Sequence, residues 1–474
     1  MKYAWLVLGV FAARFLSTAI AFPPGDGDLF WQRRLGASVL ANHAVPRALG
    51  NEAFAAPGAP WVPQEWLFGI AAYLGRSGWG WDVFSGACAL AALAAMTIAC
   101  LHAVRRGASP VDVAICVALA GIALFESFGV RAQVAVWPLL ALFLLLLDID
   151  GPWCYAAAAV AAVWSNLHAS AMLAPILAGM VAFGSALDER RIGKRTRRLA
   201  IVAVLCAVAI CFNPFGWDLP RYAIGLFNNP IKSYITEWKV TDIDDLSFVG
   251  GALPLLLLAM ILGTRGTPEA PNDRRWRDFL LLGVFGFLVL SAARNVNIFG
   301  IAALPIVASA LARRNFFGLV AQRPPTRIDR IAAVAFPVGT FAVAIAIAAR
   351  LISTTPPATG LANAPLAALS KMPGDHRVFC ADFAWCSLLL GVPHESVFLD
   401  GRADPFPRDV WEDFARVIRL EPSWRDILAR RGVDTVVAKR YSPLDQALEL
   451  ARGWRPAYTD KDYRLWLRST ATRT

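Results

Sequence analysis

Runs of about 20 apolar residues recur along this chain, and they constrain its fold more than any other feature of the sequence. An α-helix of that length crosses a hydrocarbon core of about 30 Å. The composition agrees, because 57% of the residues are hydrophobic and 17% are charged, against about 25% charged in a typical soluble domain. We therefore expect a polytopic α-helical membrane protein of about 11 spans. The expected spans cover 3–22, 80–104, 110–128, 134–149, 154–165, 170–187, 199–212, 247–263, 278–293, 297–312 and 331–352.

Basic clusters fall at alternate connections between these spans, and the positive-inside rule places such connections in the cytoplasm. They are Lys2, Arg105–Arg106, 189–198, 274–277 and 313–330. The N-terminus is then cytoplasmic, and residues after about 353 are extracytoplasmic. Membrane topology accounts for the net charge of +11, so membrane lipids are expected partners and nucleic acid is not.

The end of the chain, 353–474, has the pattern of a small soluble α/β domain. Short buried strands and amphipathic helices alternate there, which favours a mixed sheet. The expected strands are 378–383, 396–404, 433–439 and 463–469, and the expected helices are 409–420 and 422–432. About 120 residues suffice for one core. We expect a transmembrane domain over 1–352 and an extracytoplasmic domain over 353–474.

The loop at 22–66 follows the first span, and three of its acidic residues are considered for a site: Asp26, Asp28 and Glu65. Asp28 precedes a segment in which Trp31, Leu35 and Val39 share one helical stripe. Asp28 is therefore either the N-cap of a surface helix or a general base in a partly dry site, and the two roles are compatible. Glu65 is a first-turn acid or a second acid of the site. Asp26, between two glycines, is expected in a turn.

Polar residues also collect at the outer ends of later spans, opposite the basic connections. They are Arg131, Gln133, Asn166, His168, Glu237 and Arg294. Each alone is explained by an interfacial anchor or a structural ion pair, but their concentration on one side favours a functional site. Arg131 and Arg294 suit a phosphate, because guanidinium offers paired donors and stays charged. His168 is a core histidine, a donor to phosphate or a base.

Several common catalytic motifs are absent from the sequence. It has no HExxH, CxxC or His-rich cluster and no P-loop, GxGxxG or GxSxG motif. We therefore expect no metal and no cofactor, and neither nucleotide hydrolysis nor α/β-hydrolase chemistry has support.

The eight cysteines divide by position. Six lie in or beside apolar runs and are expected to be buried core residues. Cys380 and Cys386 lie in the extracytoplasmic end of the chain, where an oxidising compartment permits a disulfide. Spacing alone does not establish the geometry, so a structural disulfide is a hypothesis.

Taken together, these motifs resemble the GT-C superfamily of integral-membrane glycosyltransferases, within it a largely uncharacterised bacterial group with an extracytoplasmic domain. That group has D-x-W-W-H-L-x-x-G after the first span, then W-x-x-x-E-W-L, R-x-R-P-Q, W-x-N-x-H, N-P-x-G, E-W and F-x-D-G-R-x-D. Matching positions run through nearly the whole chain: Asp28, Trp31, Gly36, Trp61, Glu65, Arg131, Gln133, Asn166, His168, Asn213, Glu237 and 400–404. Two departures are Gln32, where the group has His, and 48–54, which lacks the group's Pro–Asp turn.

The resemblance implies a reaction and roles for residues. A polyprenyl-phosphate-linked sugar is transferred to a lipid, glycan or protein acceptor, with Asp28 as the base and Glu65 as a second acid. Arg131 and Arg294 hold the donor phosphate. Gln133, Asn166, His168, Glu237 and Arg402 are expected around the cavity. We call residues 353–474 the tail. The motif at 400–404, which contains Arg402, either covers the cavity or forms an ion pair inside the tail.

Two other classes of function remain open from the sequence. The first is a transporter or flippase of a lipid-linked substrate, which charged residues at mid-depth in several spans would favour. The second is a non-catalytic membrane scaffold whose tail binds a partner. The expected location is a bacterial inner membrane, with the N-terminus cytoplasmic.

Overall fold

The computed structural model describes residues 2–21, 27–75, 81–125, 128–227, 234–263, 275–314, 342, 368–369, 371–390 and 393–469. The chain forms two compact units. The first comprises Met1–Pro23, Gly80–Ala223 and Lys232–Pro356, and the second comprises Pro24–Trp79, Ile224–Ile231 and Pro357–Thr474. Asp26 and, apart from residue 342, the expected span 331–352 lie outside the described residues.

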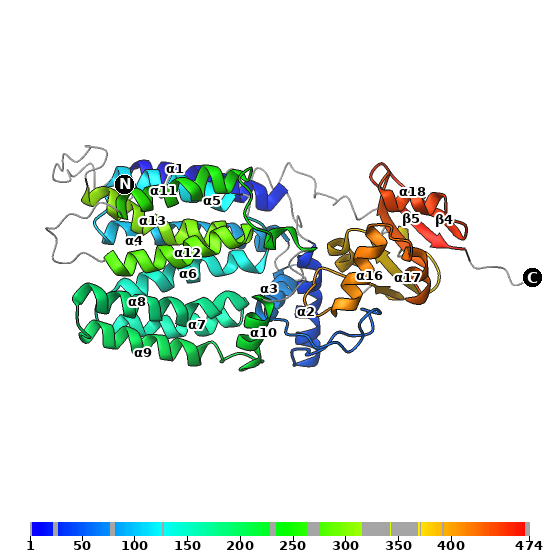
Figure 1. Ribbon diagram of the computed structural model, residues 1–474, viewed down its shortest axis with the longest axis horizontal. Helices are drawn as coiled ribbons and strands as arrows, with labels where there is room; N and C mark the ends of the chain where they lie inside the picture. The colour runs from blue at the N-terminus through cyan, green and yellow to red at the C-terminus, as the bar shows by residue number, and fades with distance from the viewer. Residues whose placement is uncertain are drawn as a thin grey trace, which may run out of the picture. The chain divides into compact units, whose positions relative to one another are not determined.

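The first unit is a bundle in which the long helices run side by side (Figure 1). Its described helices are α1 Lys2–Ala21, α4 Trp81–Arg105, α5 Pro110–Phe125, α6 Ala132–Asp148, η2 Pro152–Tyr155, α7 Ala156–Ser165, η3 Ala169–Met172, α8 Leu173–Glu189, α9 Lys194–Ala209, η5 Thr236–Trp238, η6 Phe248–Ala252, α11 Leu253–Gly263, α12 Arg275–Ser291, η7 Ala293–Asn295 and α13 Val296–Arg313. A further helix, α10 Asp218–Phe227, begins in this unit and ends in the second.

Membrane-spanning character is clear for part of this bundle. Among the described residues, three helical stretches are long and apolar enough to cross a membrane: Phe84–Arg105, Ala169–Glu189 and Ala293–Arg313. Four shorter apolar helices accompany them, at Tyr3–Leu16, Pro110–Phe125, Ala132–Asp148 and Phe248–Leu262. The predicted multi-pass helical membrane fold is confirmed, whereas the count of 11 spans is not.

Helix α13 is central to the first unit. It packs against α4, α5, α6, α11 and α12, and 83% of its apolar stretch is buried. A β-carbon at Gly300 would lie 3.0 Å from the Ala123 β-carbon, so α13 and α5 meet through small residues. Close approach through small side chains is the usual basis of helix packing in membranes, where apolar surface alone gives no preference for protein over lipid.

The second unit contains the loop that follows the first helix. Helix α2 spans Asp28–Asn42 and α3 spans Trp66–Leu74. The predicted stripe of Trp31, Leu35 and Val39 is buried on α2. A β-carbon at Gly36 would overlap the Gly69 carbonyl, so these two helices cross at backbone contact, which only glycine allows.

The same unit holds a five-stranded mixed sheet of order β2-β1-β3-β5-β4. The strands are β1 His376–Cys380, β2 Glu395–Val397, β3 Thr435–Lys439, β4 Trp454–Thr459 and β5 Tyr463–Arg468. Strand β1 is parallel to β2 and β3, and the other pairs are antiparallel. Helices η8 Phe383–Leu389, α16 Arg408–Ile418, α17 Trp424–Arg430 and α18 Pro443–Glu449 accompany the sheet. The predicted α/β character is confirmed.

The expected strand over 396–404 is shorter than predicted. Strand β2 ends at Val397, and a turn at Asp400–Arg402 follows. The Asp400 carboxylate accepts a hydrogen bond from the Arg402 backbone N–H at 3.0 Å. Such a bond from an aspartate to the backbone two residues on closes the chain into a turn in place of a strand.

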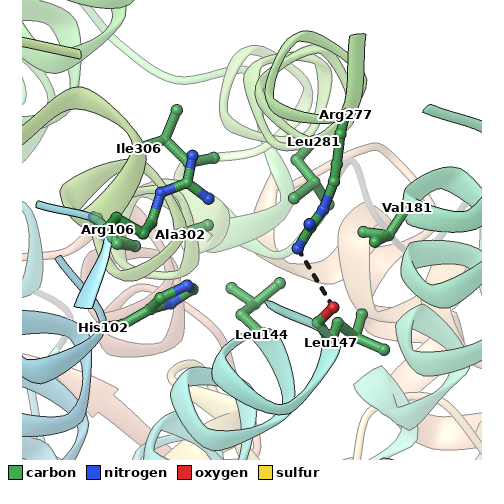
Figure 2. Close-up of a pocket in the computed structure, with 10 residues that line it drawn as sticks. His102, Arg106, Leu144, Leu147, Val181, Arg277, Leu281, Ala302 and Ile306 are labelled. Atoms are coloured by element: carbon green, nitrogen blue, oxygen red, sulfur yellow. Dashed lines mark hydrogen bonds between the residues drawn. The ribbon is translucent and has the colours of Figure 1, made fainter. Parts of the chain in front are cut away.

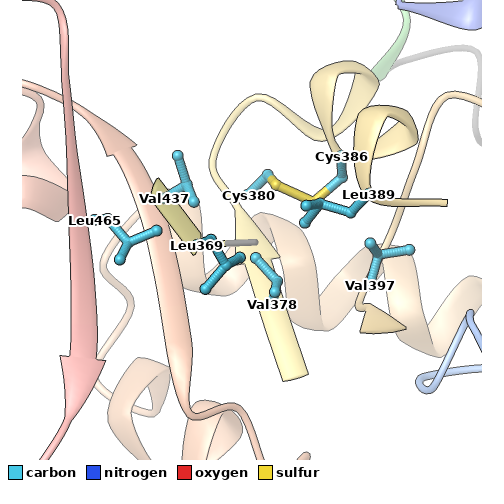
Figure 3. Packing of buried hydrophobic residues seen from close by; sticks show 8 residues of the cluster. All are labelled: Leu369, Val378, Cys380, Cys386, Leu389, Val397, Val437 and Leu465. Atoms are coloured by element: carbon cyan, nitrogen blue, oxygen red, sulfur yellow. A yellow bond between two sulfur atoms is a disulfide. The ribbon is translucent and has the colours of Figure 1, made fainter. Parts of the chain in front are cut away.

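One apolar core of this unit lies around β1 and η8 (Figure 3). The predicted disulfide joins Cys380 at the end of β1 to Cys386 in η8. Both cysteines are buried. The surrounding buried side chains are Leu369, Val378, Leu389, Val397, Val437 and Leu465. The disulfide therefore fixes η8 against the sheet.

Candidate functional site

Asp28 lies at the start of α2. The helix has Gly27 at its N-cap and Asp28 as its first residue, with no side-chain capping bond. The alternative that Asp28 is the N-cap is therefore wrong. Its Oδ1 instead accepts a hydrogen bond from the Trp31 indole Nε1 at 3.1 Å, one turn along the helix. Asp28 is half-buried, so its carboxylate is oriented by Trp31 and is not sealed in the core.

Glu65 lies at the N-cap position of α3 and also makes no capping bond. It is buried, and its Oε2 accepts a hydrogen bond of 2.5 Å from the Gln32 Nε2 of α2. This pair joins the two helices of the loop. Gln32, which departs from the resembled pattern, is therefore the partner of the second acid.

Arg402 has partners inside and outside the tail. Its guanidinium donates to the Asp400 carboxylate at 2.9 and 2.7 Å, which confirms the predicted ion pair inside the tail. It also donates to Glu52 of the first loop at 3.0 Å and lies 5.1 Å from the centre of the Trp61 ring. The prediction missed Glu52. Burial raises the pKa of Glu52, but the Arg402 charge and hydrogen bond outweigh burial and hold that pKa below its usual value.

Four predicted residues meet in the first unit, and we call Arg131, Gln133, Glu237 and Arg294 the arginine cluster. Arg131 precedes α6 and donates to Glu237 at 2.7 Å. Gln133 donates to the Arg294 carbonyl at 3.0 Å. The Arg294 guanidinium lies 4.6 Å from the centre of the Trp238 ring. The fold therefore brings these four residues together from three separate segments of the chain.

Charges in the arginine cluster act on Glu237. Burial raises its pKa, but the positive charges of Arg131 and Arg294 outweigh burial, so the pKa of Glu237 lies below its usual value. The carboxylate is therefore ionised at neutral pH and neutralises part of the charge of the two arginines. The Arg131 side chain is 27% exposed, so it is only partly buried.

Asn166 and His168 have local partners. The Asn166 side chain donates to the carbonyls of Ala162 and Phe212, both at 2.8 Å, and so links α7 to the segment after α9. His168 is buried, and its Nδ1 accepts a hydrogen bond from the Ser170 backbone N–H at 3.1 Å. Burial, together with the Arg294 charge, lowers the pKa of His168 to about 3, so the ring is neutral. Both residues support the loop between α7 and α8.

A second polar group in the first unit was not predicted from the sequence; it is made of His102, Arg106, Asp148, Arg277 and Asp278. We call it the buried charge network. His102 lies 3.1 Å and Arg106 lies 3.6 Å from the Asp148 carboxylate. Arg277 contacts Asp148, and Arg106 contacts Asp278. Arg277 also donates to the Leu147 carbonyl at 3.2 Å, and the network borders a small cavity (Figure 2).

The available signal for this network was the placement of acids. Asp148 ends an apolar run and Asp278 begins one, and ionisable groups at membrane depth usually have partners. The prediction assigned the nearby arginines to topology alone. Two arginines face two aspartates, so the network is balanced in charge, which fits a structural role more than an anion site. The described residues contain no cluster of His, Cys, Asp or Glu that can hold a metal ion.

The arrangement defines a class of protein: a multi-pass membrane protein with the GT-C fold. No family model and no curated protein matches the sequence. The archaeal oligosaccharyltransferase AglB from Archaeoglobus fulgidus, in complex with an inhibitory peptide and a dolichol-phosphate, is similar with a TM-score of 0.59 at 13% identity. That match covers 99% of this chain and 74% of AglB.

ArnT from Cupriavidus metallidurans is similar over nearly its full length. Its apo structure gives a TM-score of 0.53 at 16% identity and covers 98% of this chain and 97% of ArnT. Its structure bound to undecaprenyl phosphate gives a TM-score of 0.50 at 17% identity and covers 98% of both chains. At these identities the likeness establishes the fold.

Proposed function

We propose that this protein is a glycosyltransferase that uses a polyprenyl-phosphate-linked sugar. The acceptor is a lipid, glycan or protein on the outer face of a bacterial cytoplasmic membrane. The observation that carries the proposal is the extent of the fold: it matches 98% of ArnT, whose structure was solved with undecaprenyl phosphate. A dolichol-phosphate accompanies AglB in the same way. Two proteins of this fold thus bind the same class of lipid phosphate.

In the proposed reaction, Asp28 is the general base. It removes the proton from the acceptor hydroxyl as that oxygen attacks the anomeric carbon of the sugar, and the bond from that carbon to the phosphate oxygen breaks. The proton ends on Asp28, and the polyprenyl phosphate leaves with one more negative charge than it had in the donor. The bond from Trp31 supports this role, because a base must be held in reach of the proton that it removes.

The two arginines of the arginine cluster are the proposed phosphate ligands. Arg131 and Arg294 carry fixed positive charge next to Glu237, and guanidinium binds phosphate through paired hydrogen bonds. Increased charge on the leaving phosphate strengthens these contacts in the transition state, which is the general source of electrostatic catalysis. Gln133 and Glu237 hold the two arginines in position through the bonds described above.

The remaining predicted residues have supporting roles in this proposal. Glu65 orients α2 through Gln32. Asn166 and His168 shape the loop between α7 and α8. Arg402 ties the tail to the first loop through Glu52. The lipid-linked donor is a substrate, and the proposed chemistry includes no metal or cofactor.

The test is transfer by the purified full-length protein in lipid nanodiscs, supplied with a panel of polyprenyl-phosphate sugars. Asp28→Asn should reduce kcat by about 10²–10⁴-fold, the usual contribution of a general base. The control is Asp426→Asn, because Asp426 is an exposed acid of α17. Both variants should bind the lipid phosphate, measured by mass spectrometry of the co-purified lipid. Full activity of Asp28→Asn would exclude the base assignment.

A further inference from the structure

The turn Asp400–Arg402 of the tail packs directly against Asp28. A β-carbon at Gly401 would overlap the Asp28 Oδ1, and it would lie 2.9 Å from the Ser387 hydroxyl and 3.3 Å from Trp31 Cδ1. The backbone of Gly401 is not in the left-handed region, so its conformation does not require glycine. Space for the Asp28 carboxylate is therefore the physical reason for a glycine at this position.

The turn is held on both sides of Gly401. The Gly401 backbone N–H donates to the Ser387 hydroxyl at 3.0 Å. Asp400 and Arg402 are buried and hydrogen-bonded to each other, and Arg402 also bonds to Glu52. The position of Gly401 is thus fixed by η8, by the ion pair and by the first loop.

A second segment of the tail approaches the start of α2. A β-carbon at Gly27 would lie 2.6 Å from the Ala384 carbonyl oxygen. Ala384 belongs to η8, which also carries Ser387 and is joined to β1 by the disulfide. Two segments of the tail therefore pack against Gly27 and Asp28 so closely that neither Gly27 nor Gly401 has room for a β-carbon.

From these contacts we propose that the tail is part of the active site. The Asp400–Arg402 turn and η8 are positioning elements, and they hold the Oδ1 side of the Asp28 carboxylate against Trp31. This inference rests on the proposed function, in which Asp28 is the base. Reacting groups must be held within about 0.5 Å of the productive geometry, and an error of about 1 Å costs about 10²-fold in rate.

The experiment is Gly401→Ala in the full-length protein, with transfer kinetics measured over a range of pH. The added methyl group displaces the Asp28 carboxylate, so kcat should fall about 10–100-fold, while KM for the lipid-linked donor stays unchanged. Loss of the Trp31 bond and crowding of the carboxylate both disfavour its charged form. The acidic limb of the pH profile of kcat should therefore move to higher pH, which a purely structural defect elsewhere would not cause.

A second variant guards against misfolding of the first. Ser387→Ala removes the hydroxyl that supports Gly401 and adds no atom, so the tail keeps its packing. It should lower kcat about 3–10-fold, as expected for loss of one hydrogen bond, with the disulfide intact by mass spectrometry. Wild-type kcat in a folded Gly401→Ala or in Ser387→Ala would overturn the positioning role. Absence of transfer by the wild-type protein would instead refute the proposed function itself.

Discussion

Arg131 differs from a simple positive charge in the way it presents its donors. It donates to Glu237 at 2.7 Å, and its planar guanidinium has further N–H groups for a phosphate. Lysine at this position keeps the charge but loses the paired N–H donors of the guanidinium. Arg131→Lys should therefore raise KM for the lipid-linked donor about tenfold, the effect of one lost charge-assisted hydrogen bond.

The matched control for that variant is Arg221→Lys, because Arg221 of α10 is 80% exposed in its side chain and pairs only loosely with Asp218, at 3.6 Å. Donor titrations in nanodiscs measure both variants. Arg221→Lys should keep the wild-type KM. If Arg131→Lys kept it as well, Arg131 would not be a phosphate ligand.

Glu395 is a buried carboxyl group of β2 with an unusual titration. Burial, together with the negative charges of Asp434 and Asp375, raises its pKa from 4.5 to about 7. Its Oε2 has no hydrogen-bond partner among the described residues. Because the folded-state pKa is raised, the stability associated with the protonated form is complete below about pH 4.5 and is lost as the pH rises through about 7.

Glu395→Gln should remove this pH dependence, since glutamine stays neutral. Between pH 5 and pH 8 the wild-type tail should lose about 1–2 kcal/mol of stability, and the variant should lose much less. The stability of the tail at the two pH values is measured for both proteins by limited proteolysis after heating, followed through peptides of β1 and β2. A wild-type tail that is equally stable at both pH values would contradict the raised pKa.

Some residues of the site were predictable because their chemistry is unusual where they stand. Arg131 and Arg294 interrupt apolar sequence at the ends of spans, and Asp28 precedes an amphipathic segment. Glu52 was not predictable, because an acid in a polar loop is ordinary until the fold brings Arg402 to it across the sequence. Gly401 belongs to the matched segment 400–404, but its role was not predictable, because that role depends on the space beside Asp28, which only the fold creates.

Among the elements, η8 connects the disulfide to the proposed catalytic carboxylate. Removing the crosslink with Cys380→Ala and Cys386→Ala should destabilise the tail by about 2 kcal/mol, because the disulfide closes only a short loop. Alanine avoids a polar hydroxyl in the apolar core. The same proteolysis measurement follows the change, and the wild-type protein treated with dithiothreitol should behave like the double variant.

The control for the disulfide is Cys88→Ala, since Cys88 is a buried free cysteine of α4 in the other unit. It should leave proteolysis of the tail unchanged. If the double variant resisted proteolysis as well as the wild type, the crosslink would contribute nothing to the stability of the tail.

Elements were predictable to the extent that their patterns are local. The strands β1, β3 and β5 and the helices α16 and α17 were predicted from buried apolar runs and helical periodicity. Helix α18 and strand β4 were missed. Helix α18 is one short segment with Ser442 as its cap. Strand β4 is an edge strand with mostly half-exposed side chains and a proline, so neither element has a strong apolar pattern.

In the first unit, polar groups lie at both ends of the same helices. Helices α6 and α13 begin beside Arg131 and Arg294 of the arginine cluster, whereas α6 ends at Asp148 in the buried charge network. Helix α13 ends at Arg313, which lies 3.9 Å from Asp278 of that network. The arginine cluster is partly exposed, while Asp148 is 6% and Arg277 is 3% exposed in their side chains. The two ends should therefore respond differently to loss of a charge.

At the buried end, Asp148→Asn removes the acid that His102, Arg106 and Arg277 share. Arg106 then keeps Asp278 as an acidic partner, whereas Arg277 loses its ion pair with Asp148, and an uncompensated buried charge typically costs about 3–5 kcal/mol. The variant should unfold at a lower temperature in detergent, while the fraction that remains folded keeps the wild-type kcat.

Glu237→Gln, in the arginine cluster, should behave in the opposite way. Its stability should change little, because half-exposed ion pairs contribute about 0–1 kcal/mol, but its transfer should be slower. Thermal unfolding and kinetics on both variants separate the two roles. A stable Asp148→Asn that has lost transfer would place the buried charge network on the path of the substrate, which is what a transporter requires.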